Sequence, residues 1–347
     1  MKFGLLFSFQ TPPGSGIPSH EPYSDTLAAL PRAEELGYAS AWVATHHAQP
    51  DGLCPAPIPA MAAMAAVTTT MRIGSAILLV PLYAPLKLAE DLAVLDNISN
   101  GRIVLGVAPG YVTEEFEAHG VPRSERVGRM EESLDLLRIA WTQDSFSFEG
   151  KYYRVPETIM TPKPVQKPHV PIWYGVSAPA SLRRAARHGC PVIASPRHTL
   201  AELKEHYAIY REETAAAGLE VTEVPVIREV FVAETAKKAE ELAAPGLTYL
   251  FRELYGARSA SGERALTTDD GRLVETKDDV SWESIRERFV IGDPDYVVED
   301  LKRYQRELGA TEIICWMHVP GVRGKEAMSS LELFAREVMP AFAGVAS

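Results

Sequence analysis

The chain reads GRIVLGVAPGY from Gly101 to Tyr111. Within it, Ile103–Val107 is a short and almost wholly apolar run that small residues and a proline follow directly. Such a run is typical of a strand that is buried on both faces, as the strands of parallel sheets are. Glycines at the end of a strand let the backbone approach a ligand closely, although a tight turn would need the same residues.

Similar runs recur along the chain, and segments with helical periodicity lie between them. The expected strands are Lys2–Phe9, Ala41–Ala44, Arg72–Val80, Ile103–Val107, Ile172–Gly175, Val192–Ala194, Val226–Val232 and Glu312–Met317. The expected helices are Ser24–Leu36, Ile58–Thr69, Leu86–Ile98, Glu125–Trp141, Pro179–His188, Leu200–Ala216, Thr235–Ala243, Asp295–Leu308 and Lys325–Val338. This alternation predicts an α/β fold, a single (β/α)8 TIM barrel over residues 1–347, with a doubly wound open sheet as the alternative.

Two stretches interrupt the alternation. Asp144–His169 is rich in proline and aromatic residues, and we expect a small hairpin-like excursion between the fourth and fifth strands there. Pro245–Gly292 is long and polar, and it forms an insertion before the last helix–strand unit. Long insertions on compact barrels are usually lids or disordered loops.

Composition limits the partners and the compartment. The 347 residues carry a net charge of −11, which argues against nucleic acid or an anionic membrane as a partner. Three widely spaced cysteines favour a reduced, cytoplasmic protein without disulfides. No run of about eighteen apolar residues is present, so we expect no membrane-spanning helix.

Several common motifs are missing from the sequence. No Gly-x-Gly-x-x-Gly joins a strand to a helix, and no Walker-type loop is present. No His-Glu-x-x-His or Cys-x-x-Cys is present either, and the adjacent His46 and His47 would point to opposite faces of a strand. We therefore expect neither a metal centre nor nucleotide binding in those modes.

Polar residues at strand ends are the candidates for chemistry. His46 directly follows the second strand, and a neutral imidazole there could donate a hydrogen bond to a cofactor or exchange a proton with it, whereas a histidine that only caps the rim would look the same. Ser177 could cap the helix that begins at Pro179, where free N–H groups and hydroxyls favour an anion. Arg126 and Arg129 open the fourth helix and could pair with a phosphate, or could simply be solvated.

Several stretches, taken in order, resemble the bacterial-luciferase-like flavin-dependent oxidoreductases over most of the chain. They are Glu35-Leu36-Gly37-Tyr38, Trp42 with His46-His47, residues 85–91 (PLKLAED), residues 95–102 (LDNISNGR), Ser177 to Ser181 with residues 185–189, and Gly292-Asp293-Pro294.

The resemblance implies a barrel that binds reduced FMN, supplied by a separate reductase. His46 matches the family's active-site histidine, and Ala76 with Ile77 matches a non-proline cis peptide bond that lies against the flavin ring. By the same resemblance, the remaining cofactor-binding positions are Ala108, Gly110, Arg126, Ser177, Ala178 and Ser181. Ser177, Ala178 and Ser181 match the family's phosphate-binding residues, and Arg126 matches the arginine that pairs with the phosphate. Pro245–Gly292 corresponds in place to a mobile loop that closes over the flavin.

The sequence departs from luciferase itself around the expected flavin. Thr45, Ala108, Pro109 and Ser177 stand where luciferase has a glutamate, a reactive cysteine, a phosphate-binding arginine and an acidic residue. Light emission and the use of long-chain aldehydes are therefore not implied.

The expected activity is that of a two-component monooxygenase, in which reduced FMN and O2 oxygenate a small organic substrate. The alternatives are hydride transfer with a deazaflavin, which Arg- and Lys-rich contacts to a longer phosphate tail would support, and a non-catalytic flavin-binding relative. Phe9, Tyr111 and Trp316 end strands and are candidates for the substrate pocket, or for packing at the rim. The expected partners are the substrate, a transiently bound flavin reductase and a second copy of the chain, docked through helices beside strands two and three.

Overall fold

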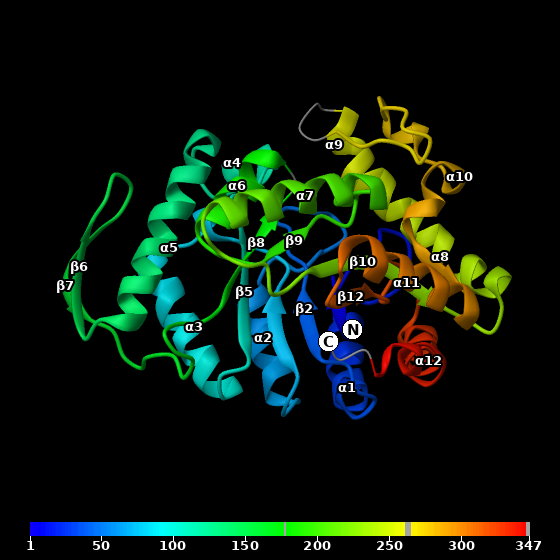
Figure 1. The fold of residues 1–347 in the computed structure, drawn as a ribbon, viewed down its shortest axis with the longest axis horizontal. Coiled ribbons are helices and arrows are strands. Elements are labelled where there is room, and N and C mark those ends of the chain that lie inside the picture. The colour runs from blue at the N-terminus through cyan, green and yellow to red at the C-terminus, as the bar shows by residue number, and fades with distance from the viewer. Residues whose placement is uncertain (177, 261–264, 345–347) are drawn as a thin grey trace.

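The computed structural model describes residues 1–176, 178–260 and 265–344. Parallel strands close into a barrel in the order β1 (Lys2–Phe7), β2 (Ser40–Val43), β3 (Arg72–Ser75), β5 (Ile103–Ala108), β8 (Ile172–Val176), β9 (Val192–Ala194), β10 (Pro225–Val232) and β12 (Glu312–Trp316) (Figure 1). Because β12 pairs with β1 and β9 pairs with β10, the sheet has no open end in this ring. The (β/α)8 barrel is confirmed, and the open-sheet alternative is wrong.

The third expected strand, Arg72–Val80, is interrupted. β3 ends at Ser75, the Ala76–Ile77 peptide bond is cis, and β4 (Leu78–Leu79) resumes the pairing with β5. Gly74 lies opposite Val104 whereas Leu78 lies opposite Val107, so the third strand holds one residue more than its partner between these pairs. The sequence hides this irregularity because apolar residues continue through it.

The first strand is shorter than expected because Phe9 has a φ of 60°, a left-handed conformation that cannot continue a strand. β1 therefore stops at Phe7, two residues before the expected end.

Helices cover the outside of the barrel close to the expected positions. They are α1 (Glu21–Glu35), α2 (Pro57–Ala66), α3 (Pro85–Ser99), α5 (Arg126–Thr142), α6 (Pro179–Arg187), α7 (Leu200–Ala216), α8 (Ala236–Leu250), α11 (Pro294–Leu308) and α12 (Gly324–Leu333), with the short α4 (Thr113–Ala118) before α5. α12 runs on as a π-helix, Phe334–Val338, and a 3-10 turn, Met339–Phe342. The helix expected from Asp295 begins one residue earlier, at Pro294, and the Asp293 carboxylate caps it by accepting the Tyr296 N–H at 3.0 Å.

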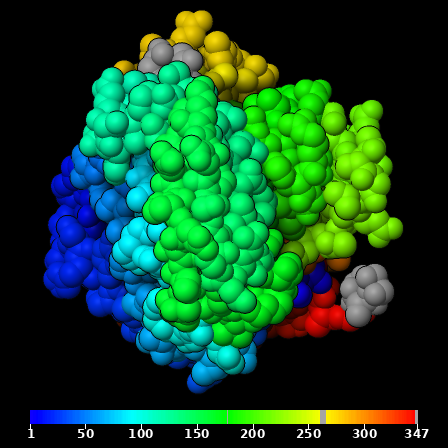
Figure 2. All heavy atoms as spheres, turned by 90° about the vertical axis from the view of Figure 1, so that its left-hand side faces the viewer, coloured from blue at the N-terminus to red at the C-terminus, as the bar shows by residue number. Residues whose placement is uncertain are grey.

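The expected excursion after α5 is a hairpin of two antiparallel strands, β6 (Ser145–Glu149) and β7 (Arg154–Ile159). It stands at the side of the barrel in Figure 1 and forms a ridge toward the viewer in Figure 2. The prediction for this stretch is confirmed.

The insertion 245–292 is more regular than expected. α8 continues through Pro245 to Leu250, and it is followed by a π-helix (Phe251–Gly256), α9 (Ala257–Ala260), 3-10 turns at Lys277–Asp279 and Arg286–Arg288, α10 (Trp282–Ile285) and β11 (Val290–Gly292). β11 pairs with the end of β10. Of the two alternatives for this stretch, a lid or a disordered loop, the described part does not fit a loop without structure, because buried apolar side chains such as Phe251, Val280 and Phe289 pack the polar stretch against the barrel.

The middle of the barrel is filled by side chains. Trp42 and Trp173 stack at 4.9 Å between ring centroids and are both almost fully buried, with Leu6, Val104 and Ile314 in the same cluster. A packed lumen leaves the carboxyl ends of the strands as the place for a ligand.

Two further expectations concern membranes and cysteines. Among the described residues, no helix has the length and apolar character that crossing a bilayer requires. Cys54, Cys190 and Cys315 are buried free thiols.

Candidate active site

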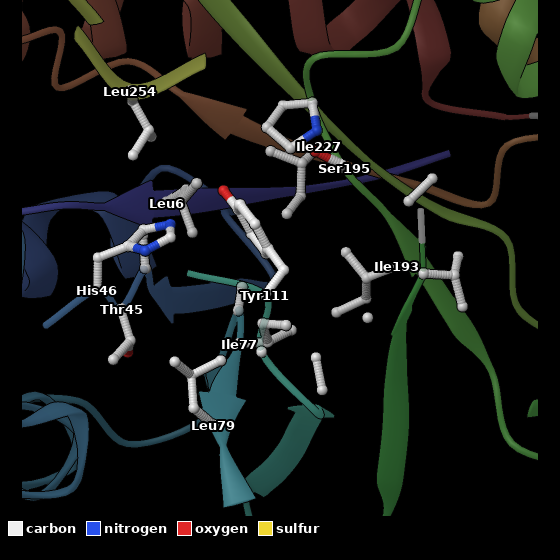
Figure 3. Close-up of a pocket in the computed structure, with 18 of the residues that line it drawn as sticks. Leu6, Thr45, His46, Ile77, Leu79, Tyr111, Ile193, Ser195, Ile227 and Leu254 are labelled. Atoms are coloured by element: carbon white, nitrogen blue, oxygen red, sulfur yellow. The ribbon is translucent and has the colours of Figure 1, made fainter. Parts of the chain in front are cut away.

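A cavity opens at the carboxyl ends of the strands (Figure 3). It holds about 950 Å³ of empty space when the open solvent at its mouth is included. Small residues contribute much of its lining, namely Ala44, Ala76, Ala108, Gly110, Gly175 and Ala194. The cavity is therefore wide enough for a flat ring system.

His46 lies in this lining, just beyond the end of β2. Its Nδ1 lies 2.9 Å from Oε1 of Glu115, and the same oxygen accepts the backbone N–H of His47 at 2.8 Å. Glu115 comes from α4, which follows β5, and its side chain is 1% exposed. The expected histidine is thus held by a buried carboxyl group that the sequence did not reveal.

The hydrogen bonds to Glu115 fix its charge. Burial by itself would raise the pKa of this carboxyl group, but the hydrogen bonds from His46 and His47 outweigh burial and the pKa is lowered. An ionised carboxylate only accepts hydrogen bonds, so Nδ1 of His46 carries the proton that lies between the two side chains. Figure 3 shows His46 directed into the cavity, where Nε2 can accept a proton or, once protonated, return it.

His47 lies on the other side of the loop, away from the cavity. Its ring packs edge-to-face on His119 with 4.6 Å between centroids, and burial followed by the charge of His119 lowers the pKa of His47. The expected divergence of the two adjacent histidines is confirmed.

One wall of the cavity is formed by Ala76, Ile77 and Ala108, where the Ala76–Ile77 bond is cis as the resemblance implies. Glycines allow this wall to form. A Cβ at Gly106 would lie 2.0 Å from the carbonyl oxygen of Ser75, and one at Gly175 would lie 2.6 Å from Cδ1 of Ile77. Any side chain at these positions would push the wall out of place.

The first turn of α6 meets the cavity at Ser181. The Ser181 hydroxyl donates to the Ala178 carbonyl at 2.7 Å and accepts the Ala178 N–H at 3.3 Å. The residue at the N-cap position of α6 is Ala178. Ser177, the expected cap, lies outside the described residues. A helix N-terminus with a hydroxyl group is a favourable place for a phosphate.

The two arginines proposed for the phosphate lie apart from the described lining. Arg126 donates to the Arg123 carbonyl at 2.9 Å, and burial together with the charge of Arg123 lowers its pKa. Arg129 pairs with Glu125 at 2.8 Å and stacks on Tyr152, so it is engaged elsewhere. A phosphate contact of Arg126 stays a prediction.

Of the three residues suggested for the substrate, Tyr111 and Trp316 line the cavity. Phe9 does not, because the left-handed turn of the chain at this residue directs its ring onto Tyr23, where the two rings stack at 4.4 Å. The expectation for Phe9 is wrong.

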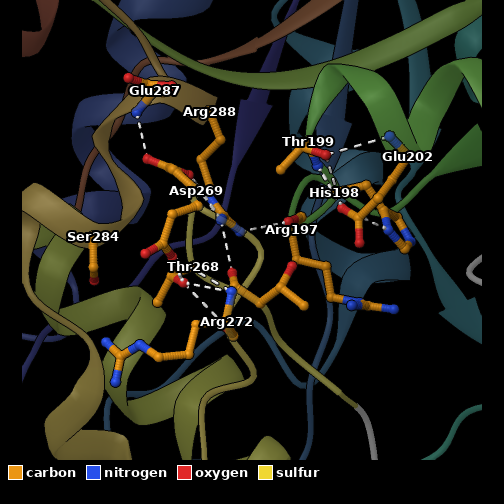
Figure 4. Close-up of polar contacts among 12 residues, drawn as sticks. Arg197, His198, Thr199, Glu202, Thr268, Asp269, Arg272, Ser284, Glu287 and Arg288 are labelled. Atoms are coloured by element: carbon orange, nitrogen blue, oxygen red, sulfur yellow. Dashed lines mark hydrogen bonds and ion pairs between the residues drawn. The ribbon is translucent and has the colours of Figure 1, made fainter.

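The insertion provides Leu254 and Tyr255 to the cavity from its π-helix. A buried arginine anchors it: Arg288 donates to Asp269 at 2.8 Å, to the Thr267 carbonyl at 2.7 Å and to the Arg197 carbonyl at 2.9 Å (Figure 4). Because Arg197 follows Ser195 and Pro196, which also line the cavity, Arg288 ties the insertion to the cavity edge.

These features fit a flavin mononucleotide. The flat apolar wall suits an isoalloxazine ring, the first turn of α6 suits a single phosphate, and His46 lies in the lining between β2 and β5. No lysine or arginine occurs among the described residues that line the cavity.

A closed barrel with such a cavity at the carboxyl ends of its strands has the arrangement found in barrel enzymes. The chain belongs to the luciferase-like monooxygenase family, because the sequence profile of that family matches residues 1–312. This family includes both FMN-dependent monooxygenases and oxidoreductases that depend on the deazaflavin F420.

Individual relatives represent both kinds of chemistry. The chain is 28% identical to the oxygenase component of the flavin-dependent trigonelline monooxygenase of Acinetobacter baylyi, over 92% of this chain and 90% of that protein. It is 26% identical to the F420-dependent glucose-6-phosphate dehydrogenase of Amycolatopsis mediterranei, over 91% and 93% of the two chains. The crystal structure of the monooxygenase RslO1 from Streptomyces bottropensis superimposes with a TM-score of 0.84 at 26% identity, covering 99% of this chain and 100% of that one.

Proposed function

We propose that this protein is the oxygenase of a two-component FMN monooxygenase. A separate flavin reductase supplies reduced FMN, one atom of O2 is transferred to a small organic substrate, and the other leaves as water while the flavin is oxidised. The observation that carries this proposal is the His46–Glu115 pair at 2.9 Å, set beside the flat wall of a largely apolar cavity.

Reduced FMN, when bound, supplies the two electrons that activate oxygen. The chain's own residues would do the rest. Ala76, Ile77 and Ala108 would support the ring, and the first turn of α6 with Ser181 would hold the phosphate. His46, oriented by Glu115, would accept and return a proton through Nε2. Leu254 and Tyr255 would exclude water from the site.

The charge of the cavity favours FMN over a deazaflavin. F420-type coenzymes carry a long anionic tail, which calls for basic residues along its path. The described lining contains neither lysine nor arginine, and the chain has a net charge of −11. The similarity to the trigonelline monooxygenase component supports the same choice.

The proposal is tested by anaerobic titration of the protein with reduced FMN and with reduced F420, followed by rapid mixing with oxygenated buffer. We expect tighter binding of reduced FMN, and a reoxidation time course with a separate slow phase that free flavin lacks. Tighter binding of F420, or reoxidation indistinguishable from that of free FMN, would contradict the proposal.

We also propose that the protein is a homodimer. α2 and α3 lie side by side on the barrel (Figure 1), and the large apolar side chains of Val94 and Ile98 on α3 are 45% and 53% exposed. Together with Ile58 and Ala62 of α2 they line a hollow on this face. A continuous apolar surface of this kind favours an interface with a second copy.

A further inference from the structure

Glu229 is a buried carboxyl group that the proposed chemistry of His46 does not use. It lies on β10 and has no exposed surface, and neither of its carboxylate oxygens has a hydrogen-bond partner among the described residues. A buried carboxyl group without partners is costly for folding, so its presence calls for an explanation outside the stability of the barrel.

The strand geometry directs Glu229 into the barrel. Ile227, two residues earlier on the same face, lines the cavity. Arg228, between them, points outward and donates to the hydroxyl of Tyr304 on α11 at 2.9 Å. Alternation along β10 therefore places the Glu229 side chain on the cavity side, beyond Ile227.

The neighbour of Glu229 across the sheet is Trp316, its paired residue on β12. Paired residues on adjacent strands lie roughly 5 Å apart with their side chains on one face. Trp316 lines the cavity, is 3% exposed, and its indole Nε1 is likewise buried without a hydrogen-bond partner among the described residues. An unsatisfied acceptor and an unsatisfied donor thus belong to paired residues on adjacent strands, of which Trp316 lines the cavity and Glu229 does not.

This side is distinct from the wall proposed for the flavin. Ala76, Ile77 and Ala108 belong to β5 and the segment after β3, whereas Glu229 and Trp316 belong to β10 and β12. Between these two pairs of strands run β8 and β9 on one side of the ring and β1 and β2 on the other. A substrate in front of the flavin would face the Glu229–Trp316 side.

The charges around Glu229 restrict what it can bind. Arg228 and Arg288 both act on its carboxyl group, yet burial outweighs them and raises the pKa of Glu229 to about 7. A cationic ligand group would lie in the field of two arginines and would leave the Trp316 N–H unsatisfied. A hydroxyl group satisfies both residues, because it donates to the carboxylate and accepts from the indole.

We propose that Glu229 and Trp316 form the recognition site for a hydroxyl group, phenolic or alcoholic, on an otherwise apolar substrate. This inference rests on the proposed function in one respect only, which is that the molecule bound here is the substrate of the proposed reaction. A buried hydrogen bond supports discrimination of about ten-fold or more against an analogue that lacks the donor and leaves its partner unsatisfied.

The test uses 2-naphthol and 2-methoxynaphthalene as probes, with the full-length protein in the absence of flavin and fluorescence as the readout. We expect the wild-type protein to bind 2-naphthol at least about ten-fold more tightly than the methyl ether, which cannot donate a hydrogen bond. We expect Glu229→Leu and Trp316→Phe each to reduce this ratio to below about three-fold. Glu312→Gln, a change at a buried carboxyl group at the opposite end of β12, is the matched control and should keep the wild-type ratio.

A wild-type ratio below three-fold, or a ratio that survives in either substituted protein, would overturn the inference. Circular dichroism first establishes that each variant is folded, and if Glu229→Leu does not fold, Trp316→Phe decides the test alone. Titration of the wild-type protein with reduced FMN separates this inference from the proposed function. Selective binding of 2-naphthol without FMN binding would refute only the proposed function, and FMN binding without selectivity would refute only the recognition site.

Discussion

At the scale of single residues, the orientation of His46 depends on one buried carboxylate. Glu115 is 69 residues away in sequence and lies among other acidic residues, at Thr113-Glu114-Glu115. The sequence pattern does not indicate which of these acidic side chains is buried against His46 and which is exposed to solvent. The sequence therefore predicted His46 at the end of its strand, but it could not predict the residue that orients it.

We expect His46 to carry its proton on Nδ1, because an ionised Glu115 can only accept. In Glu115→Leu this acceptor is lost, so the tautomer should become mixed. Two-bond ¹H–¹⁵N correlation spectra at alkaline pH, where imidazole is neutral, report the tautomer directly. His169, whose Nδ1 lies 2.8 Å from the Val170 carbonyl, serves as the internal control that should not change. A wild-type His46 protonated on Nε2 would contradict the mechanism.

Glu229 should make the protein's stability depend on pH. Its pKa is about 7 in the folded protein and near 4.5 when exposed, so the folded state holds a proton that the unfolded state has lost between these values. The contribution is favourable below pH 4.5 and is lost as the pH rises through 7. Glu229→Leu should therefore gain stability relative to wild type by roughly 3 kcal/mol from pH 4.5 to pH 8.

Urea denaturation of both proteins across this pH range measures the difference, in which the titration of all other groups largely cancels. A difference in unfolding free energy that stays constant with pH would show that Glu229 is not protonated in the folded state near neutrality.

At the scale of elements, the alternation of apolar runs and amphipathic segments predicted the barrel strands well. It failed where tertiary contacts override local pattern. α8 continues through Pro245 because Leu247, Leu250 and Phe251 are buried beyond it, and packing of these side chains offsets the hydrogen bond that a proline removes. β11, with only three residues, is too short to stand out from its surroundings.

Gly106 and Gly175, which lie behind the wall formed by Ala76, Ile77 and Ala108, should differ in their tolerance of an added methyl group. In Gly106→Ala the new Cβ meets the Ser75 carbonyl oxygen, which is backbone, so we expect a loss of about 1–3 kcal/mol of stability. In Gly175→Ala the three nearest atoms are side-chain atoms, Cδ1 and Cγ2 of Ile77 at 2.6 and 3.0 Å and Cβ of Ala108 at 3.4 Å, so the fold should persist. Ile77 should then move into the cavity and weaken binding of reduced FMN by roughly ten-fold.

Urea denaturation and FMN titration of the two variants check this pair of predictions, each variant serving as the control for the other. Wild-type stability in Gly106→Ala would contradict the close approach of β3 and β5. Wild-type FMN affinity in Gly175→Ala would place the flavin away from Ile77.

At the scale of the whole molecule, the expectation of a flavin cofactor came from the resemblance to the family. No single motif in the sequence predicts it. The barrel brings Thr45, Ala108, Pro109 and Ser181 to one cavity although they come from three separate stretches of the sequence. The sequence predicted that these residues lie close together, because each of them follows an expected strand of the barrel. The shape of the cavity also depends on the extra residue in the third strand, which the sequence does not reveal. It depends too on the insertion, whose place was predicted but whose π-helix was not.

The proposed dimer gives a prediction at the same scale. Val94→Glu combined with Ile98→Glu should convert the protein to monomers, because burying two carboxylates against a second apolar face is unfavourable. Ile159→Glu, on a side chain that is 71% exposed in the hairpin, is the control and should stay dimeric. Sedimentation velocity distinguishes the two states, and a monomeric wild-type protein at micromolar concentration would exclude the dimer.

The central claim is that the cavity at the carboxyl ends of the strands binds FMN. A crystal structure of the protein grown anaerobically with reduced FMN tests it most directly. We expect the ring to lie against Ala76, Ile77 and Ala108, the phosphate to lie at the first turn of α6 near Ser181, and His46 to lie within hydrogen-bond reach of the ring. A flavin bound elsewhere on the protein, or a cavity that stays free of flavin at saturating concentration, would contradict it.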